Sequence, residues 1–228
     1  MSPYVIAPPQ QASLPVVGTD KQFPVRRVYC VGRNYAEHTR EMGHDPNKEA
    51  PFFFMKAADT LLTDGKFPYP SMSIDVQWEI ELVVALKSGG KNIKAADAMS
   101  HVFGYAIGLD MTRRDLQSVA KKTGRPWEIG KSFDLSTPCT ALAPVEKVGH
   151  LANGAIWLEL NGVRKQSADL KDMIWDVPSQ IEYLSTFWEL KAGDLILTGT
   201  PAGVGAVKKG DQLKGHVDGL ADLNVMVV

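Results

Sequence analysis

The sequence contains few cysteines and no strong excess of charge of either sign. Its 228 residues include only two cysteines, Cys30 and Cys139, which lie far apart and without the spacing of a metal-binding motif. Nothing else in the sequence is typical of a secreted protein, so we expect both thiols to be reduced. The formal net charge of −1 predicts no nucleic-acid partner, and any electrostatic attraction for a small substrate must therefore be local.

Long hydrophobic segments are also absent. No run approaches the roughly 18 apolar residues that a membrane-spanning helix needs. Residues 1–11 have neither the basic region nor the apolar region of a signal peptide. We therefore expect a cytoplasmic protein with no membrane partner. A chain of this length with 44% apolar residues can bury a sizeable core without disulfides.

The hydrophobic pattern predicts a strand-rich α+β protein. Proline-rich residues 1–24 indicate an extended N-terminal arm, and we expect residues 25–228 to form one domain. Most predicted strands follow one another without intervening helices, which excludes a regular βαβ array. The predicted strands are 26–32, 52–56, 78–86, 102–109, 155–163, 194–198 and 223–228. The predicted helices are 35–42 with Asn34 as its cap, 112–122 with Thr112 as its cap, and 178–190, with a helical turn at 95–99.

Two glutamates at alternate positions of a strand are the first candidate site. Side chains at i and i+2 share one face of a strand, so Glu79 and Glu81 lie roughly 7 Å apart if both are in a strand. Between apolar neighbours these like charges are unfavourable unless a cation lies between them. Asp110, at the end of the strand 102–109, would supply a third oxygen ligand. Such a set favours Mg²⁺ or Mn²⁺, with Ca²⁺ as an alternative, over zinc. An exposed strand face paired with lysines remains an alternative, as does Asp110 acting as a helix cap.

His38 and Glu41 are the second candidate pair. They are spaced i, i+3 on the predicted helix 35–42 and therefore lie on the same face. A carboxylate that orients an imidazole and raises its basicity is suited to the activation of water. The alternative is a solvated pair on the protein surface.

Two further features are ambiguous when considered alone. Lys131 follows a glycine in a short mixed segment, and lysines are usually solvated. The loop 199–205 contains three glycines but does not end in the lysine and hydroxyl residue of a P-loop. A dinucleotide-binding motif that began at Gly203 would need a glycine at position 208, where the sequence has a lysine. We therefore exclude a nucleotide site and expect a tight loop whose backbone N–H groups can hold an anion.

Taken together, these segments resemble the fumarylacetoacetate hydrolase family, and most closely its short acylpyruvate and fumarylpyruvate hydrolases. The resemblance covers the chain from about Arg26 to its end, and leaves the arm outside. It depends on six segments in order: GRNYAEHTREMG (32–43), FFFMK (52–56), WEIELVVAL (78–86), GYAIGLDMTRRDLQ (104–117), PWEIGKSFD (126–134) and LTGTPAGVG (197–205).

The resemblance implies a mixed β-sandwich roll with a short lid helix, usually dimeric, over residues 25–228. It implies that Glu79, Glu81 and Asp110 hold a divalent cation, Mg²⁺ or Mn²⁺. It also implies that His38 and Glu41 form a catalytic dyad on the lid helix.

Further residues that match the family's motifs are expected to contact the substrate or act in catalysis. Arg114 and Gln117 match its substrate-contacting arginine and glutamine, Lys131 its active-site lysine, and Thr200 the threonine of its glycine-rich loop. Arg33, in the segment of the dyad, is predicted as an additional cation that contacts the substrate.

We therefore expect a hydrolase that cleaves an acylpyruvate (a 2,4-dioxo acid), with fumarylpyruvate as the first candidate and fumarate and pyruvate as its products. Such a reaction belongs to the degradation of aromatic compounds of the gentisate type. Water activated by Glu41 and His38 attacks the distal ketone, and Lys131 and the cation stabilise the departing enolate. Arg125 is predicted to bind the second carboxylate, with a solvated surface arginine as the alternative. The alternative functions are oxaloacetate decarboxylation, isomerisation of an unsaturated dioic acid, and a non-catalytic metal-stabilised binding module.

Overall fold

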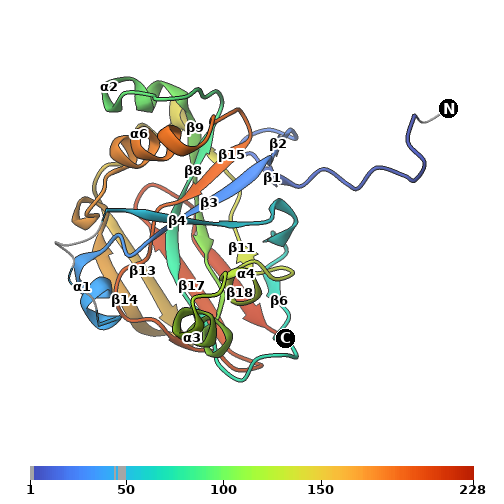
Figure 1. The fold of residues 1–228 in the computed structure, drawn as a ribbon, viewed down its shortest axis with the longest axis vertical. Coiled ribbons are helices and arrows are strands. Elements are labelled where there is room, and N and C mark those ends of the chain that lie inside the picture. The colour runs from blue at the N-terminus through green and yellow to red at the C-terminus, as the bar shows by residue number, and fades with distance from the viewer. Residues whose placement is uncertain (1–2, 44, 46–49) are drawn as a thin grey trace.

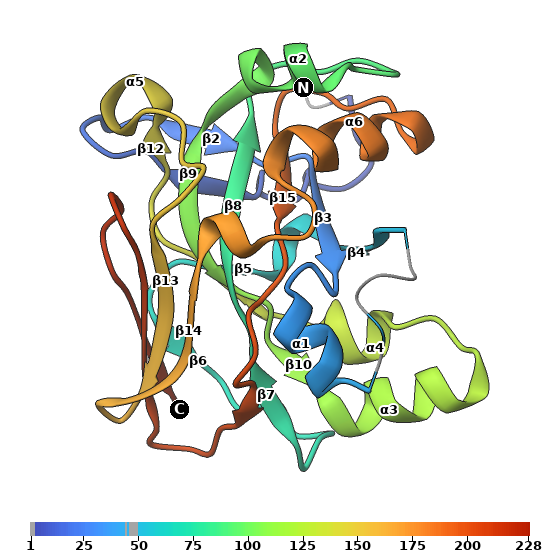
Figure 2. The same ribbon diagram turned by 90° about the vertical axis from the view of Figure 1, so that its left-hand side faces the viewer.

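Two β-sheets pack face to face at the centre of the molecule (Figures 1 and 2). The computed structural model describes residues 3–43, 45 and 50–228. Its strands and few short helices confirm the predicted strand-rich α+β class. The first sheet has six strands in the order β12 (Ala143–Pro144), β9 (Val102–Leu109), β8 (Ile80–Leu86), β15 (Asp194–Leu197), β3 (Arg27–Gly32) and β4 (Phe52–Lys56).

The second sheet has five strands and covers one face of the first. Its order is β14 (Val163–Asp169), β13 (Ala155–Leu160), β17 (Gln212–Val217), β18 (Leu223–Val227) and β6 (Lys66–Phe67). Each sheet contains one parallel pair, β15 with β3 and β18 with β6, and its other pairs are antiparallel. Both sheets are therefore mixed, as the resemblance implied.

Short strands and helices complete the fold around these sheets. Helices α2 and α6 lie together at one end of the six-stranded sheet, and α1, α3 and α4 lie at the other end (Figure 2). The helices are α1 (Ala36–Glu41), α2 (Ala95–Ala98), α3 (Arg114–Thr123), α4 (Glu128–Lys131), α5 (Val145–Val148) and α6 (Val177–Phe187), with 3₁₀ turns at Ala58–Thr60, Met99–His101 and Leu170–Asp172. The short strands are β1 (Ser13–Pro15) with β2 (Gln22–Pro24), β5 (Leu61–Leu62) with β11 (Thr137–Pro138), and β7 (Val76–Trp78) between β10 (Thr112–Arg113) and β16 (Gly205–Ala206).

Strand β8 is buried on both faces, which explains its continuously apolar sequence from Leu82 onward. Ile80, Leu82 and Val84 point into the core between the two sheets. Val83 and Ala85 point to the opposite face, where they pack in a second core cluster. Because side chains alternate along a strand, Glu81 lies on this second face, at the end where the apolar cluster stops.

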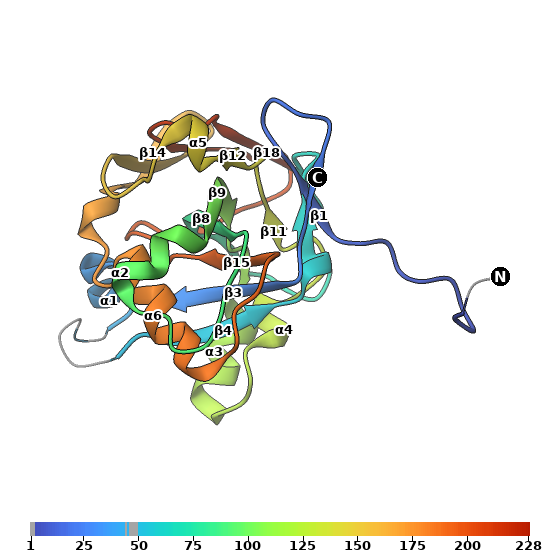
Figure 3. The same ribbon diagram turned by 90° about the horizontal axis from the view of Figure 1, so that it is seen from above.

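The N-terminal segment differs from the extended arm that we expected over residues 1–24. Residues 3–11 are exposed and run away from the body of the protein (Figures 1 and 3), while residues 1–2 lie outside the described part. In contrast, β1 and β2 form a hairpin whose Leu14 and Phe23 are buried in the second core cluster. The prolines at 15 and 24 occupy the ends of these short strands, where a missing N–H donor is tolerated.

Some boundaries and caps also differ from the prediction. The expected strand 155–163 is the hairpin of β13 and β14, because Asn161 and Gly162 adopt φ values of 51° and 79° and form a tight turn. The expected strand 78–86 is divided into β7 and β8 at Glu79. Neither Asn34 nor Thr112 caps a helix, since α1 begins after Tyr35 and α3 after Arg113. Both side chains form tertiary hydrogen bonds instead.

Both cysteines are free and buried, in agreement with the expected reduced thiols. Burial raises the pKa of Cys139 to about 12, which makes its thiolate inaccessible near neutral pH. In the described parts of the chain, no helix combines the length and the apolar character that a membrane crossing requires.

The contact of β9 with β12 predicts a strong effect of one added methyl group. A Cβ atom on Gly104 would lie 2.2 Å from the carbonyl oxygen of Ala143, a backbone atom that cannot move alone. We expect Gly104→Ala to lower the free energy of unfolding by about 1–3 kcal/mol, as overpacking commonly does. Gly90→Ala is the matched control, because its Cβ would meet only a side-chain atom of Ile93 at 3.7 Å. Urea denaturation of both variants tests this, and equal stabilities would contradict it.

Candidate active site

One cavity collects most of the predicted site residues. Its lining includes residues of α1, α3 and α4, the helices that lie at one end of the six-stranded sheet in Figure 2. The predicted residues among those that line it are Arg33, His38, Glu79, Glu81, Asp110, Arg114, Gln117, Lys131 and Thr200. Glu41 is joined to this set through a hydrogen bond with His38.

Strand register brings the three carboxylates together. Glu81 pairs with Gly108 across β8 and β9, and the backbone N–H of Asp110 donates to the carbonyl of Glu79 at 2.8 Å. Directly opposed residues of an antiparallel pair share a face, so Asp110 lies on the same face as both glutamates. Each carboxylate offers an oxygen within 4.8 Å of those of the other two, and all three residues are buried.

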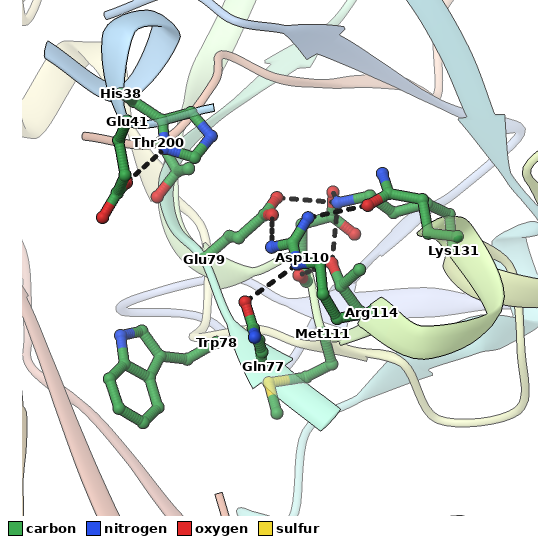
Figure 4. A network of polar contacts seen from close by, with 12 residues as sticks. His38, Glu41, Gln77, Trp78, Glu79, Asp110, Met111, Arg114, Lys131 and Thr200 are labelled. Atoms are coloured by element: carbon green, nitrogen blue, oxygen red, sulfur yellow. Dashed lines mark hydrogen bonds and ion pairs between the residues drawn. The ribbon is translucent and has the colours of Figure 1, made fainter. Parts of the chain in front are cut away.

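Three cations neutralise two of these carboxylates. Lys131 Nζ lies 2.7 Å from Glu79 Oε2 and 2.6 Å from Asp110 Oδ2, between the two side chains (Figure 4). Lys56 Nζ lies 2.8 Å from Asp110 Oδ1, and Arg114 donates to Glu79 Oε1. Burial alone would raise the pKa of Glu79, but the charges of Lys131 and Arg114 outweigh it and hold this pKa below its ordinary value.

Glu81 is the carboxylate that these cations leave uncompensated. Its Oε2 accepts a hydrogen bond from Gly199 N at 2.7 Å, and Oε1 has no donor among the described residues. Burial raises the pKa of Glu81 well above its usual range, and the nearby charges of Asp110 and Glu79 add to the shift. A buried group in this state favours the arrival of a further positive charge.

The donor set therefore fits a divalent cation. Three buried carboxylates supply hard oxygen ligands, and no histidine or cysteine of the described chain joins them. This chemistry suits Mg²⁺ or Mn²⁺ better than zinc. Glu79, Glu81 and Asp110 are the residues that would hold the ion.

His38 and Glu41 form a hydrogen-bonded pair on α1. His38 Nδ1 lies 2.9 Å from Glu41 Oε2, and Nε2 has no partner among the described residues. A carboxylate that accepts the Nδ1 proton leaves Nε2 as the proton-accepting nitrogen. His38 is buried and lines the cavity, and it lies across from Glu79 and Arg114 (Figure 4). The arrangement can therefore remove a proton from a molecule in the cavity.

The glycine-rich loop that follows β15 connects the carboxylate cluster to this pair. Gly199 N donates to Glu81, and Gly203 N donates to Glu41 Oε1 at 3.1 Å. The predicted anion-holding N–H groups thus bind the protein's own carboxylates. Gly203 has a φ of 99°, and a Cβ there would lie 2.1 Å from the Lys165 carbonyl, so other residues are disfavoured at this position.

Gln166 is a buried residue of the site that sequence reasoning missed. Its side-chain oxygen accepts from Ile80 N at 3.1 Å, between the two glutamates. Its nitrogen donates to Thr200 Oγ1 at 2.8 Å and to the Pro201 carbonyl at 2.6 Å. Because Thr200 Oγ1 accepts this bond, its own proton is free to point into the cavity. No signal marks Gln166 in the polar sequence of β14.

Two predicted residues lie in surroundings that differ from the expectation. All three N–H donors of Lys131 are used by Glu79, Asp110 and Thr112 Oγ1, so its ammonium links the carboxylates. Arg125 is exposed and lines a neighbouring cavity beside β4, not the one that contains the carboxylates. The structure therefore does not bring Arg125 into the site.

Comparison with known proteins agrees with this geometry. Residues 27–228 match the family described as fumarylacetoacetate (FAA) hydrolase C-terminal. A crystal structure of fumarylpyruvate hydrolase from Pseudomonas aeruginosa with Mn²⁺ and pyruvate is similar at a TM-score of 0.97, with 50% identity and 99% coverage of both chains. The fumarylpyruvate hydrolase of Ralstonia sp. is 43% identical over 80% of this chain and 95% of its own. A mitochondrial oxaloacetate decarboxylase of Dictyostelium discoideum is 42% identical over 86% of this chain and 90% of its own.

The carboxylate cluster predicts a specific loss of metal affinity. Glu81→Gln removes one of three anionic ligands. Substitution of residues that only contact the ligands weakens metal affinity by roughly 10–100-fold, so the loss of Mn²⁺ affinity in Glu81→Gln should be larger. Isothermal titration of the metal-free protein with Mn²⁺ measures this. Glu37→Gln, on the exposed side of α1, is the control and should leave the dissociation constant unchanged.

The same titration has an expected pH dependence. Because the pKa of Glu81 is raised in the metal-free protein, its carboxyl group retains a proton that the ion must displace. Mn²⁺ affinity should therefore increase with pH more steeply in the unmodified protein than in Glu81→Gln. Parallel pH profiles, or an unchanged affinity, would exclude Glu81 as a ligand.

Proposed function

The chain belongs to the fumarylacetoacetate hydrolase family, and from this premise we propose that it is a metal-dependent hydrolase of acylpyruvates, with fumarylpyruvate as its first candidate substrate. One observation carries the proposal: the buried carboxylate cluster and the His38–Glu41 pair face one cavity. The relative from Pseudomonas aeruginosa supports it, because pyruvate, bound in that structure, is a product of acylpyruvate cleavage.

His38 is the proposed general base. Its Nε2 takes a proton from water while Glu41 holds Nδ1 and stabilises the charge that develops on the imidazole. The N–H of Gly203 fixes Glu41 from the opposite side, so the pair keeps one orientation. The carboxylate of Glu41 is about one-third exposed, whereas His38 is almost fully buried, so water can reach the pair from the side of α1.

Carbon–carbon cleavage follows from this proton transfer. The water oxygen bonds to the distal ketone carbon C4, and the tetrahedral centre then expels C3 with the bonding electron pair. The products are a carboxylic acid and the enolate of pyruvate, which takes back one proton at C3. A divalent cation held by Glu79, Glu81 and Asp110 would supply positive charge where the enolate develops negative charge.

Donors in the cavity are available for the pyruvate end of the substrate. Gln117 accepts from Arg114 through Oε1 at 2.7 Å, which leaves its amide N–H groups without a partner in the described chain. The free proton of Thr200 provides a second donor, and we assign both residues to the carboxylate and 2-oxo oxygens. Arg114 and Lys131 hold the ligand carboxylates in place, while Arg33 is an additional cation in the wall.

Oxaloacetate decarboxylation is the second candidate function. The Dictyostelium relative with that name is nearly as similar as the Ralstonia hydrolase, at 42% against 43% identity. Both reactions generate the enolate of pyruvate, so the same charged cluster suits either. The two reactions differ in that hydrolysis requires an attacking water and decarboxylation does not. The His38–Glu41 pair, which can activate water, is therefore needed only for hydrolysis.

We also propose a homodimer and a cytoplasmic location. Exposed Phe187, next to Phe53 on the edge strand β4, supports an apolar contact between subunits. The boundary of the catalytic domain at residue 25 stays a prediction. The hairpin before this boundary packs into the second core cluster, so its residues contribute to the same core as the domain.

A substrate panel tests the proposed reaction. With Mg²⁺ or Mn²⁺ we expect turnover of fumarylpyruvate and acetylpyruvate into pyruvate and the corresponding acid, and slower loss of CO₂ from oxaloacetate. Chelation should abolish these activities and either metal should restore them. Turnover of oxaloacetate alone would replace the proposal by the second candidate, and full activity without metal would overturn both.

The dyad should affect chemistry more than binding. We expect His38→Ala and Glu41→Gln each to lower kcat for acetylpyruvate by about 10²–10⁴-fold, the usual contribution of a general base. The double variant should be little worse than either single variant, because residues that act as a unit are not additive. Steady-state kinetics beside the surface control Glu37→Gln measures this, and fully additive losses would separate the two roles.

A further inference from the structure

The cavity continues along one face of α3 beyond the carboxylate cluster. Arg114, Gln117 and Lys121 all line it, at a spacing of three and then four residues, which places them on one side of the helix. Arg114 bonds to Glu79 and marks the inner end. Seven residues of helix advance by roughly 10 Å, so Lys121 marks the outer end.

Lys121 differs from the other buried or half-buried lysines of the site. Lys56 and Lys131 are each bonded to carboxylates, whereas Lys121 forms no hydrogen bond or ion pair within the described part of the chain. Its Nζ lies over the Trp127 ring, 6.0 Å from the ring centre. Partial burial lowers the pKa of Lys121, and the charges of Arg33 and Arg114 lower it further. Among residues 3–43, 45 and 50–228, no carboxylate pairs with this ammonium at the outer end of the cavity.

Aromatic side chains form part of the wall of the same cavity. Phe52, Phe54 and Trp127 all face the cavity, and Phe52 packs edge-on against Trp127 with centroids 5.5 Å apart. An unsaturated carbon chain fits against such a wall, while its ends require charge. The inner end has the cations of the carboxylate cluster, and the outer end has the ammonium of Lys121.

We propose that Lys121 binds the distal carboxylate of a dicarboxylic acylpyruvate and so selects such substrates over monocarboxylic ones. This inference rests on the proposed function, because it defines the substrate class of the same cavity. The carboxyl carbons of extended fumarylpyruvate are separated by six carbon–carbon bonds of about 1.5 Å, or roughly 7–8 Å in a straight zigzag. Gln117, which we assign to the pyruvate end, lies four residues before Lys121, an advance of roughly 6 Å along α3 that is of the same order as this length. Lys121 thus takes the role that the sequence suggested for Arg125.

The kinetic test compares two neighbouring lysines of α3. Lys121→Met should lower kcat/KM for fumarylpyruvate by about 10- to 100-fold, the effect of losing one charge-assisted hydrogen bond, and leave acetylpyruvate within about 3-fold. Lys122→Met is the matched control, because Lys122 is exposed and does not line the cavity, and it should change neither value. Equal losses on both substrates, or loss of the preference in Arg125→Leu and not in Lys121→Met, would overturn the proposal.

A binding test keeps this proposal separate from the reaction itself. 2-Oxopimelate and 2-oxoheptanoate have the length of fumarylpyruvate but no 4-oxo group, and only the first has a distal carboxylate. With Mn²⁺ present, calorimetry should find 2-oxopimelate bound more tightly by about 10-fold or more, and Lys121→Met should remove this difference. A difference that persists in Lys121→Met would exclude the subsite. A protein that shows this difference but cleaves no acylpyruvate would retain the subsite and lose the proposed function.

Discussion

The site depends on the burial of three carboxylates that must share a small number of positive charges. Lys131 is central to this balance, because its ammonium lies between Glu79 and Asp110 and uses all of its donors there. Removing one partner of such a buried pair leaves an uncompensated charge and is strongly destabilising. Lys56 and Arg114 bind the remaining oxygens of the same two carboxylates, which leaves Glu81 as the carboxylate that still requires a positive charge. The protein's own cations thus neutralise Glu79 and Asp110, and the charge of Glu81 would be neutralised by a divalent ion.

The loop between β15 and β16 links this charged cluster to the proposed general base. One backbone N–H binds Glu81 and another binds Glu41, so two glutamates from distant parts of the chain are fixed by one short segment. Gln166 holds the same segment from the second sheet through Thr200 and Pro201. The two sheets are therefore coupled where the chemistry takes place. A change in β14 can reach the site through Gln166 although it lies in a strand that contributes no ligand.

Charge is distributed along the cavity in a way that matches the proposed substrate. At the inner end, cations are balanced by the carboxylates of the protein. At the outer end, Lys121 has no carboxylate partner among the described residues, and aromatic side chains form part of the same wall. A long, flat, unsaturated diacid is complementary to a cavity with a charged inner end, an aromatic wall and a cation at its outer end. A small acid such as oxaloacetate would contact only the inner part. Selectivity would then arise at a distance from the bonds that change, as it often does when remote contacts contribute to orientation.

Local patterns in the sequence determined the secondary structure and the chemistry of the ligands. Alternation along the segment 78–86 placed Glu79 and Glu81 on one face, and a spacing of three placed His38 beside Glu41, because both periodicities are properties of the backbone alone. The ordered motifs also supported the family. The dipeptide Asn161–Gly162 is typical of a two-residue hairpin turn, and it joins β13 to β14. Only the tertiary structure decided which cations meet which carboxylates: it assigned Lys131 to the cluster, placed Arg125 outside, and brought in Gln166 and Lys121. The physical reason is that a polar side chain carries no periodic signal, and its role is determined by partners that are far away in sequence and become neighbours only when the sheets pack.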